Sequence, residues 1–192
     1  LDIASQHPRS AIVLKYFGPY AQRYEDLVDT RILVKHGDYE AAGKMFNGLL
    51  IPFLQDKQSA KDLAYALKII INIVYGMSSA SFDNKFRHKD NHDNIIAKRG
   101  ALFMLELKEQ VQSMGFTVAH IKTDSIKIPD ATQEIIDFVF WFGKQYGYTF
   151  EHEHTYNRMA LVNKAVYIAQ VEDGSWEATG PMFAQPFVYK TL

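Results

Sequence analysis

The sequence predicts an α+β protein: an antiparallel sheet with helices on one face, and a helical subdomain inserted after the first strand. Three observations lead to this prediction. A short apolar segment opens the chain, three helical patterns follow it without an intervening strand, and the rest alternates between helices and hairpins. Hairpins join neighbouring strands through tight turns, so the sheet that they build is antiparallel.

Polar and glycine-containing turns delimit the elements of the first half. Residues 1–5 are expected to form a strand that ends in the polar run Ser5-Gln6-His7-Pro8. Gly37-Asp38 and Gln55-Asp56 separate the helical patterns, and a polar loop follows them at residues 81–92. Helices are therefore predicted over residues 20–36, 38–54 and 57–76.

The second half alternates between helices and strands. A long amphipathic helix at residues 93–114 ends at Gly115, which is suited to a helix C-cap. A hairpin follows, with strands at 116–121 and 125–128 around a Lys122-Thr123-Asp124 turn. The remaining predicted elements are a helix at 131–146, strands at 149–156 and 158–170, and a turn at Asp173-Gly174 before Trp176.

The composition is that of an ordinary globular domain. The chain has 192 residues, of which 47% are hydrophobic and 22% charged, and its net charge is −1. This balance excludes a globally basic, histone-like mode of nucleic-acid binding, but not a local basic groove. Cysteine is absent, which excludes disulfides, thiolate metal sites and cysteine nucleophiles and fits a reducing compartment. No apolar run approaches the roughly 20 residues of a membrane span. The chain opens on Leu-Asp-Ile-Ala without a leader, so we expect a piece of a longer protein.

The predicted helix at 57–76 has two chemically different faces. At about 100° per residue, cations, an amide and phenols fall on one stripe and aliphatic side chains on the opposite one. The polar stripe is either a solvated face or a surface that binds a polyphosphate. It consists of Lys61, Tyr65, Lys68, Asn72 and Tyr75, and the expected core stripe consists of Leu63, Leu67, Ile70, Ile71 and Val74.

A second pair of cations lies on the predicted helix at 20–36. Arg31 and Lys35 are one helical turn apart, so they share a face. If the helices at 20–36 and 57–76 pack antiparallel, these cations and those of the polar stripe could converge on one phosphate chain. Surface pairs at this spacing are common, so a solvated face is the alternative interpretation.

Two aspartates stand at expected strand ends. Asp2 lies in the first strand, and Asp124 lies at the tip of the predicted hairpin. Carboxylates on neighbouring strand ends could hold two Mg²⁺ ions about 3.5–4 Å apart for phosphoryl transfer. Turn chemistry alone also explains Asp124, because Asp is a favoured turn residue.

Three segments of the chain resemble motifs that occur in the same order in one protein family. They are D-I-A-S-Q-H-P-R-S-A-I at 2–12, K-I-I-I-N-I-V-Y-G at 68–76 and H-I-K-T-D-S-I-K-I at 120–128. The first resembles D-x-x-S-L-Y-P-S-I-I, the second K-x-x-x-N-S-x-Y-G and the third D-T-D-S. These are motifs of family B (polymerase α-like) DNA polymerases, and the similarity is greatest to bacteriophage and prophage members. The resemblance spans residues 1 to about 170.

The resemblance implies a polymerase palm for the sheet and a fingers subdomain for the inserted helices. Residues 1–19 and 77–170 would be palm, residues 20–76 fingers, and residues 171–192 the start of the connection to the thumb. The 3′–5′ exonuclease domain and most of the thumb of the parent chain would be missing. The resemblance also implies a phage- or prophage-encoded protein of the bacterial cytoplasm.

The resemblance further implies roles for individual residues. Asp2 and Asp124 would be catalytic and, with the backbone of Ile3, would hold two Mg²⁺ or Mn²⁺ ions. The implied nucleotide-binding residues are Ser5, Gln6, His7, Arg31, Lys35, Lys68 and Asn72. Tyr75 and Gly76 would meet the nascent base pair and template, and Lys122, Ser125, Lys164 and Tyr167 the primer or DNA.

This sequence departs from the family pattern at four places. His7 stands where the family usually has the Tyr that excludes a 2′-OH, Gln6 replaces an apolar residue, and Ile73 replaces Ser. Lys122 replaces the first Asp of D-T-D-S. A cation beside a metal site repels the metal. We therefore expect Lys122 to point away from the metals and to contact a phosphate of the primer or the triphosphate.

The function predicted is template-directed DNA synthesis, in which a primer 3′-OH attacks a dNTP on primer–template DNA. The alternative is a catalytically degenerate, polymerase-like module that only binds nucleic acid, as Lys122 would favour. The fingers motif at 68–76 argues against a reverse transcriptase or RNA polymerase. His152 and His154 alternate as in some zinc sites, but no third ligand accompanies them in the sequence.

Overall fold

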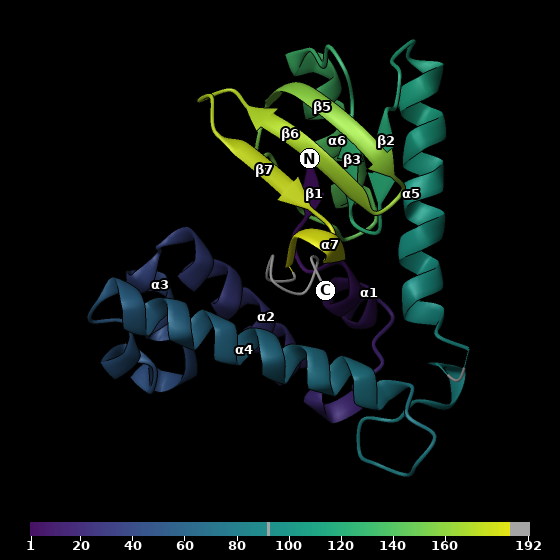
Figure 1. Ribbon diagram of the computed structural model, residues 1–192. Coiled ribbons are helices and arrows are strands. Elements are labelled where there is room, and N and C mark those ends of the chain that lie inside the picture. The colour runs from purple at the N-terminus through teal and green to yellow at the C-terminus, as the bar shows by residue number, and fades with distance from the viewer. Residues whose placement is uncertain (92, 185–192) are drawn as a thin grey trace, which may run out of the picture. The chain divides into compact units, whose positions relative to one another are not determined.

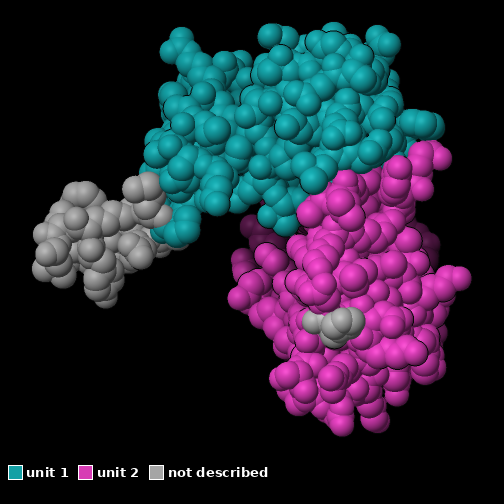
Figure 2. Space-filling model, turned by 90° about the vertical axis from the view of Figure 1, so that its right-hand side faces the viewer, with its two compact units in different colours: residues 1–3, 104–144, 149–192 teal, residues 4–103, 145–148 magenta. Residues whose placement is uncertain are grey.

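The computed structural model describes residues 1–91 and 93–184, so the end of the expected thumb connection, residues 185–192, lies outside the described residues. The chain divides into two compact units, which Figure 2 colours separately. Unit 1 comprises residues 1–3, 104–144 and 149–192, and unit 2 comprises residues 4–103 and 145–148. This division of the chain differs from the expected palm and fingers boundaries, which stay predictions.

Unit 2 is built from helices. The predicted helices at 20–36, 57–76 and 93–114 are confirmed, each with ends displaced by no more than two residues. The α-helices are α1 (Gln6–Val13), α2 (Ala21–His36), α3 (Tyr39–Lys44), α4 (Lys57–Ser78) and the first half of α5 (Ile95–Ser113). Short 3₁₀ helices lie at Gly18–Tyr20, Met45–Gly48, Ile51–Phe53 and Lys89–Asn91.

Helices α2 and α4 pack side by side and antiparallel (Figure 1). Near the start of α2, the Tyr24 hydroxyl donates to the carbonyl oxygen of Ile71 near the end of α4, at 3.1 Å. At the opposite ends, Val34 of α2 shares an apolar cluster with Ala60 of α4. Burial raises the pKa of Tyr24, so its hydroxyl remains a donor at neutral pH. The antiparallel packing that the phosphate-binding hypothesis requires is therefore present.

The buried stripe of α4 corrects one prediction. Leu63 and Val74 pack against the core as expected. Ile70 is 44% exposed, so its assignment to the core is wrong. It lies about 100° around the helix from Ile71, beyond the edge of the stripe that meets α2. The buried residues of α4 are Ala60, Leu67, Ile71 and Ser78.

The predicted helix at 38–54 is wrong beyond Lys44. There α3 ends, and a kinked turn at Met45–Gly48 and the 3₁₀ helix Ile51–Phe53 follow. Phe46 (φ 50°) and Asn47 (φ 57°) have left-handed backbone, which cannot continue a right-handed helix of L-residues. The guanidinium of Arg23 lies 5.3 Å from the centre of the Phe46 ring, a tertiary contact that local periodicity does not reveal.

The predicted strand at 1–5 is shorter than expected, and a helix replaces the turn after it. β1 contains only Asp2–Ile3, and α1 begins directly after Ser5, which has left-handed backbone (φ 60°). Pro8 fits within the first turn of α1, because first-turn N–H groups have no acceptor within the helix. The buried hydroxyls of Ser10 and Tyr148 lie 2.6 Å apart and hold α1 in unit 2.

Unit 1 contains two antiparallel sheets (Figure 1). The predicted hairpin is present, but its first strand is shorter than the expected 116–121 and includes Lys122, so the turn is Thr123-Asp124, with Thr123 left-handed (φ 48°). The first sheet has the order β2-β3-β1-β4, with β2 at His120–Lys122, β3 at Ser125–Lys127 and β4 at Phe150–Glu151. The second has the order β5-β6-β7, with β5 at Tyr156–Asn163, β6 at Val166–Val171 and β7 at Trp176–Thr179.

The predicted strand at 158–170 is wrong as a single strand. The chain reverses at Lys164-Ala165, and β5 and β6 pair with each other. The side-chain oxygen of Asn163 accepts from the backbone N–H of Ala165 at 2.9 Å, which stabilises the turn. The predicted turn at Asp173-Gly174 is confirmed between β6 and β7, where Gly174 has a φ of 87°.

Helices supply the rest of the core of unit 1. The predicted helix at 131–146 is confirmed as α6 (Gln133–Gln145), and α7 spans Pro181–Ala184. Fully buried aliphatic residues come from β3 (Ile126), α6 (Ile135 and Val139) and the second half of α5 (Leu107 and Val111). Within the described residues, no helix combines the length and apolarity that crossing a membrane requires.

The two neighbouring isoleucines of α4 test which face is core. Ile71→Ala removes a side chain that is 2% exposed and leaves a cavity against α2, so we expect a loss of about 3 kcal/mol in the free energy of unfolding. Ile70→Ala, the matched control, should cost less than about 1 kcal/mol. Urea unfolding followed by circular dichroism measures both. Equal losses would contradict the packing described.

Candidate active site

The first sheet of unit 1 has one polar side, and its pairing places a row of functional side chains there. Asp2 lies opposite Ser125 on β3 and opposite Glu151 on β4. Ser125 in turn lies opposite Lys122 on β2. Residues directly opposite each other in antiparallel strands share a side of the sheet. The row across the sheet is therefore Lys122, Ser125, Asp2 and Glu151.

The structure brings Asp2 and Asp124 to neighbouring positions on adjacent strands. The backbone N–H of Ile3 donates to the carbonyl oxygen of Asp124 at 2.8 Å, and Asp2 is the preceding residue. Asp124 comes directly after the left-handed Thr123 and directly before β3. Because it lies in the turn, its side chain is not bound to the strict alternation of a regular strand. Both aspartates are partly exposed.

A cation that the sequence analysis missed lies against Asp2. The Lys127 ammonium is 3.5 Å from Oδ2 of Asp2, and the two side chains are 13% and 29% exposed, respectively. The amino group of Leu1 is 3.8 Å from the same oxygen. Lys127 is two residues after Ser125 on β3, so alternation puts it on the side of Asp2. This pair follows from the register of β1 against β3, which cannot be read from the sequence.

The predicted DNA-contacting residues of unit 1 differ in exposure. The Lys122 ammonium donates to the carbonyl oxygen of Ala165 at 3.5 Å, in the turn between β5 and β6. It thus shares the side of Asp2 but is engaged by another group. Ser125, on β3, is buried. Lys164 is exposed in the turn between β5 and β6. Tyr167 is only 8% exposed and packs against the ring of His120, with 5.8 Å between ring centroids.

In unit 2, two of the predicted nucleotide-binding residues meet directly. The Arg31 guanidinium, on α2, donates to the hydroxyl of Ser5 at 2.9 Å. Ser5 immediately precedes α1, whose first N–H groups point out of the helix unpaired by helical acceptors. A cation and a helix N-terminus therefore lie together, an arrangement that attracts anions.

The aromatic residues of the first and second motifs also meet. The rings of His7 and Tyr75 have centroids 5.1 Å apart and are tilted by 37°. The Tyr75 hydroxyl donates to the side-chain oxygen of Asn94 at 3.2 Å, and burial raises the pKa of Tyr75. Gly76 follows Tyr75 on the exposed surface of α4. His7 and Tyr75 thus form one aromatic surface from two segments far apart in sequence.

The side chain of Gln6 is buried in unit 2. It is 3% exposed, and its amide nitrogen lies 3.5 Å from the carbonyl oxygen of Gly100. A Cβ added at Gly100 would come within 2.7 Å of the Gln6 side chain, so the pair is closely fitted. These contacts hold the side chain of Gln6 against Gly100 inside unit 2.

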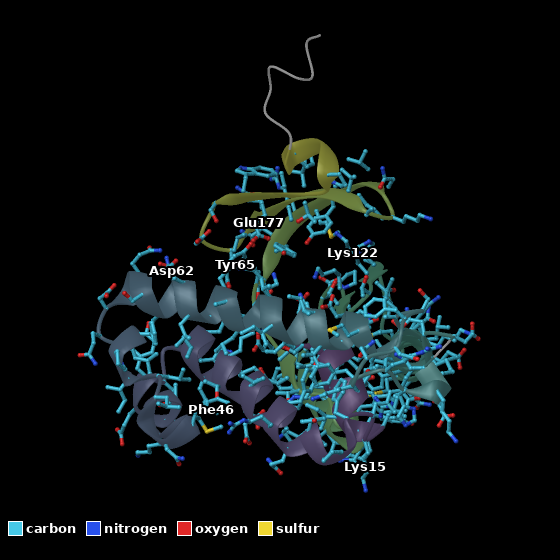
Figure 3. The ribbon with its side chains drawn as sticks, turned by 90° about the horizontal axis from the view of Figure 1, so that it is seen from below. Lys15, Phe46, Asp62, Tyr65, Lys122 and Glu177 are labelled. Carbon is cyan, nitrogen blue, oxygen red and sulfur yellow. The ribbon has the colours of Figure 1, made fainter. Side chains whose placement is uncertain are left out.

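The polar stripe of α4 is exposed as predicted for Lys61, Tyr65, Lys68 and Asn72, whereas Tyr75 is half-buried. Figure 3 shows Asp62 and Tyr65 projecting from the side of α4 that faces away from α2. Lys35 is exposed one turn after Arg31 on α2. Helices α2 and α4 of unit 2 therefore carry exposed lysines, as a triphosphate-binding surface needs.

Metal binding is compatible with the residues around Asp2. Within the part of the chain that the structure describes, no group of three or more His, Cys, Asp or Glu side chains is arranged to hold a metal ion. Mg²⁺ does not need such a group, because it is typically held by one or two carboxylates together with substrate phosphates and water. Asp2, Asp124 and the backbone of Ile3 supply a donor set of that kind.

The histidines that alternate near β4 take part in a polar network instead of a metal site. His154 lies 3.2 Å from Oε1 of Glu177, and the Tyr156 hydroxyl donates to Oε2 of Glu177 at 2.7 Å. Figure 3 labels Glu177, which is on β7. Burial, followed by hydrogen bonds to Glu177 and Tyr167, raises the pKa of Tyr156. His152 pairs instead with the hydroxyl of Thr155 at 3.1 Å.

Comparisons with known proteins show a likeness in fold and in part of the sequence. The fold is similar to a solved family B DNA polymerase from the hyperthermophilic archaeon Pyrobaculum calidifontis, with a TM-score of 0.60 and 14% identity over 93% of this chain and 26% of that one. The sequence is 29% identical to the DNA polymerase zeta catalytic subunit of Schizosaccharomyces pombe over 59% of this chain and 7% of that protein. No protein-family profile matches the sequence.

These comparisons show similarity to family B DNA polymerases, in fold over most of the chain and in sequence over part of it. The chain spans about a quarter of the solved polymerase and a much smaller part of the curated relative. The expected likeness to this family is thereby confirmed.

The ion pair between Asp2 and Lys127 can be measured by a double-mutant cycle of Asp2→Asn and Lys127→Met. Because both side chains are mostly removed from water, we expect a coupling of about 1 kcal/mol in the free energy of unfolding. The exposed pair of Glu40 and Lys44, substituted in the same way, should give less than about 0.5 kcal/mol. Additive effects of the first two substitutions would mean that the contact is absent in solution.

Proposed function

We propose that this chain is the palm and fingers part of a DNA-directed DNA polymerase of the family B type, and that it transfers nucleotides from dNTPs to a primer 3′-OH. The observation that carries the proposal is the position of Asp2 beside Asp124 on paired strands, produced by segments 122 residues apart. The similarity in fold to a family B polymerase supports the same conclusion.

In this proposal, unit 1 supplies the carboxylates. Asp2, Asp124 and the backbone carbonyl of Ile3 would hold divalent metal, Mg²⁺ or Mn²⁺. When bound, such ions lower the pKa of the attacking hydroxyl and neutralise charge on the phosphates. Exposure of both aspartates leaves them accessible to substrate phosphates. Ser125, the cross-strand neighbour of Asp2, is buried between them and would lie close to the primer end.

Unit 2 supplies the binding surface for the incoming nucleotide. The N-terminal N–H groups of α1 and the Arg31 guanidinium attract phosphate oxygens, and Lys35, Lys68 and Asn72 extend this surface along α2 and α4. The aromatic surface of His7 and Tyr75 would carry the sugar and base, since stacking on aromatic rings favours any base. Gly76 leaves room for close approach beside Tyr75.

Primer–template DNA is the partner in this proposal. Lys122 on β2, Tyr167 on β6 and Lys164 in the turn between β5 and β6 would meet it. The chain is nearly neutral, so few phosphates can be neutralised and duplex affinity will be low at physiological salt. We therefore expect the isolated chain to be weakly active at best. A phage or prophage origin and the missing exonuclease and thumb domains of a parent chain remain part of the proposal.

A specific observation favours a second function, a degenerate polymerase-like module that binds nucleic acid without turnover. Lys122 occupies the position of a family aspartate, and Lys127 pairs with Asp2. Two cations on the polar side of the sheet oppose metal binding there. The two functions differ in one property, because only the enzyme requires divalent metal at Asp2 and Asp124.

Binding of a fluorescent dNTP to the chain tests the role of unit 2. Lys68→Ala removes a charge from the proposed triphosphate surface, so we expect a five- to tenfold weaker Kd. Lys44→Ala, which removes an exposed lysine of α3 paired with Glu40, is the matched control and should leave Kd unchanged. An unchanged Kd for Lys68→Ala, or equal losses for both variants, would exclude this surface.

Primer extension at low ionic strength tests the enzyme against the degenerate module. We expect weak, Mg²⁺-dependent extension that Asp124→Asn reduces at least a hundredfold, because a required carboxylate is lost. Raising the salt to the physiological range should suppress the activity of the unmodified chain as well. Extension that survives Asp124→Asn would contradict the proposed site, whereas dNTP binding without any extension would favour the second function.

A further inference from the structure

Lys127 touches the proposed metal site, but the proposed polymerase assigns it no contact with substrate. It lies on β3 directly opposite His120 and on the same side of the sheet as Asp2. Its ammonium is 3.5 Å from Oδ2 of Asp2, and its side chain is 13% exposed. A lysine so well removed from water is retained because its charge is paired.

The surroundings of Lys127 direct its charge to Asp2. His120, its cross-strand neighbour, uses Nε2 in a contact of 3.2 Å with the carbonyl oxygen of Lys164 and offers no negative charge. Lys122, the other cation of this side, is engaged by the carbonyl oxygen of Ala165. Asp2 is therefore the carboxylate that balances Lys127.

We propose that Lys127 is an intramolecular competitor of divalent metal at Asp2. This inference rests on the proposed role of Asp2 as a metal ligand. An ammonium and a divalent ion cannot both take the same carboxylate oxygen, and they repel each other at ion-pair distances. Metal that binds through Oδ2 of Asp2 therefore has to displace the Lys127 ammonium, and metal on the other oxygen is repelled by it, so Lys127 raises the metal concentration at which the site fills.

The structure gives the displaced side chain somewhere to go. A cavity of 550 Å³ within unit 1 is lined by Lys127 itself and by polar residues that include His152, Asn157 and Arg158. Lysine has a long, flexible stem and an ammonium that water solvates strongly. Rotation of the stem can thus carry the ammonium from Asp2 toward the polar residues of this cavity without a change in the backbone.

Binding of Mn²⁺ to the full chain, followed by the electron paramagnetic resonance signal of free Mn²⁺, tests the proposal without any need for activity. Lys127→Met keeps the bulk of the stem and removes the charge, so we expect Mn²⁺ to bind about tenfold more tightly. Lys127→Arg keeps the charge and should restore the affinity of the unmodified chain to within about twofold. Lys144→Met, which removes an exposed lysine of α6, is the matched control and should change nothing.

The outcomes separate this inference from the proposed function. Asp2→Asn should abolish the binding that Lys127→Met strengthens. If Asp2→Asn abolishes binding but Lys127→Met has no effect, the competition is refuted and the metal site stands. If Asp2→Asn leaves Mn²⁺ affinity unchanged, the metal site itself is refuted, and the inference with it. A larger rise in Tm with Mn²⁺ for Lys127→Met than for the unmodified chain would confirm that the variant folds and binds.

Discussion

The polar side of unit 1 depends on one constraint, the pairing of the two-residue strand β1 between β3 and β4. Asp2 lies opposite Ser125 and Glu151, and Ile3 lies opposite Phe150. Because side chains alternate along a strand, a slip of one residue would turn Ile3 to the polar side and bury Asp2 among aliphatic residues. Burial of Ile3 and Ile126 therefore fixes the register, and the register places Asp2 beside Asp124 and Lys127.

Unit 2 obeys a comparable constraint in the packing of α2 against α4. The hydrogen bond from Tyr24 to the carbonyl of Ile71 and the burial of Ile71 fix the rotation of α4. With Ile71 inward, Lys68 and Asn72 remain exposed. The chain connects the two constrained regions directly, since Ala4 alone separates Ile3 of the sheet from Ser5 at the start of α1. Asp2 and Ser5, which the proposed function assigns to metal and to phosphate, thus lie three residues apart in the sequence.

The sequence predicted elements with strong periodicity and missed those that tertiary contacts decide. The helices α2, α4, α5 and α6 have long periodic patterns and clear ends, and they were predicted nearly residue by residue. The break after Lys44 and the helix α1 were missed, because left-handed backbone at Phe46 and a tolerated proline at position 8 leave no periodic signal. Motif order brought Asp2 and Asp124 to notice, but the pairing of Lys127 with Asp2 follows from strand register alone.

Whether Asp2 and Asp124 form one metal site can be measured directly by NMR. Mn²⁺ added well below stoichiometric amounts broadens the backbone amide signals of residues close to it. If the site is shared, we expect the amide signals of Ile3, Asp124 and Ser125 to broaden first. Broadening that begins instead around Glu172 and Asp173, which line a cavity of 450 Å³ that neither Asp2 nor Asp124 lines, would contradict a shared metal site.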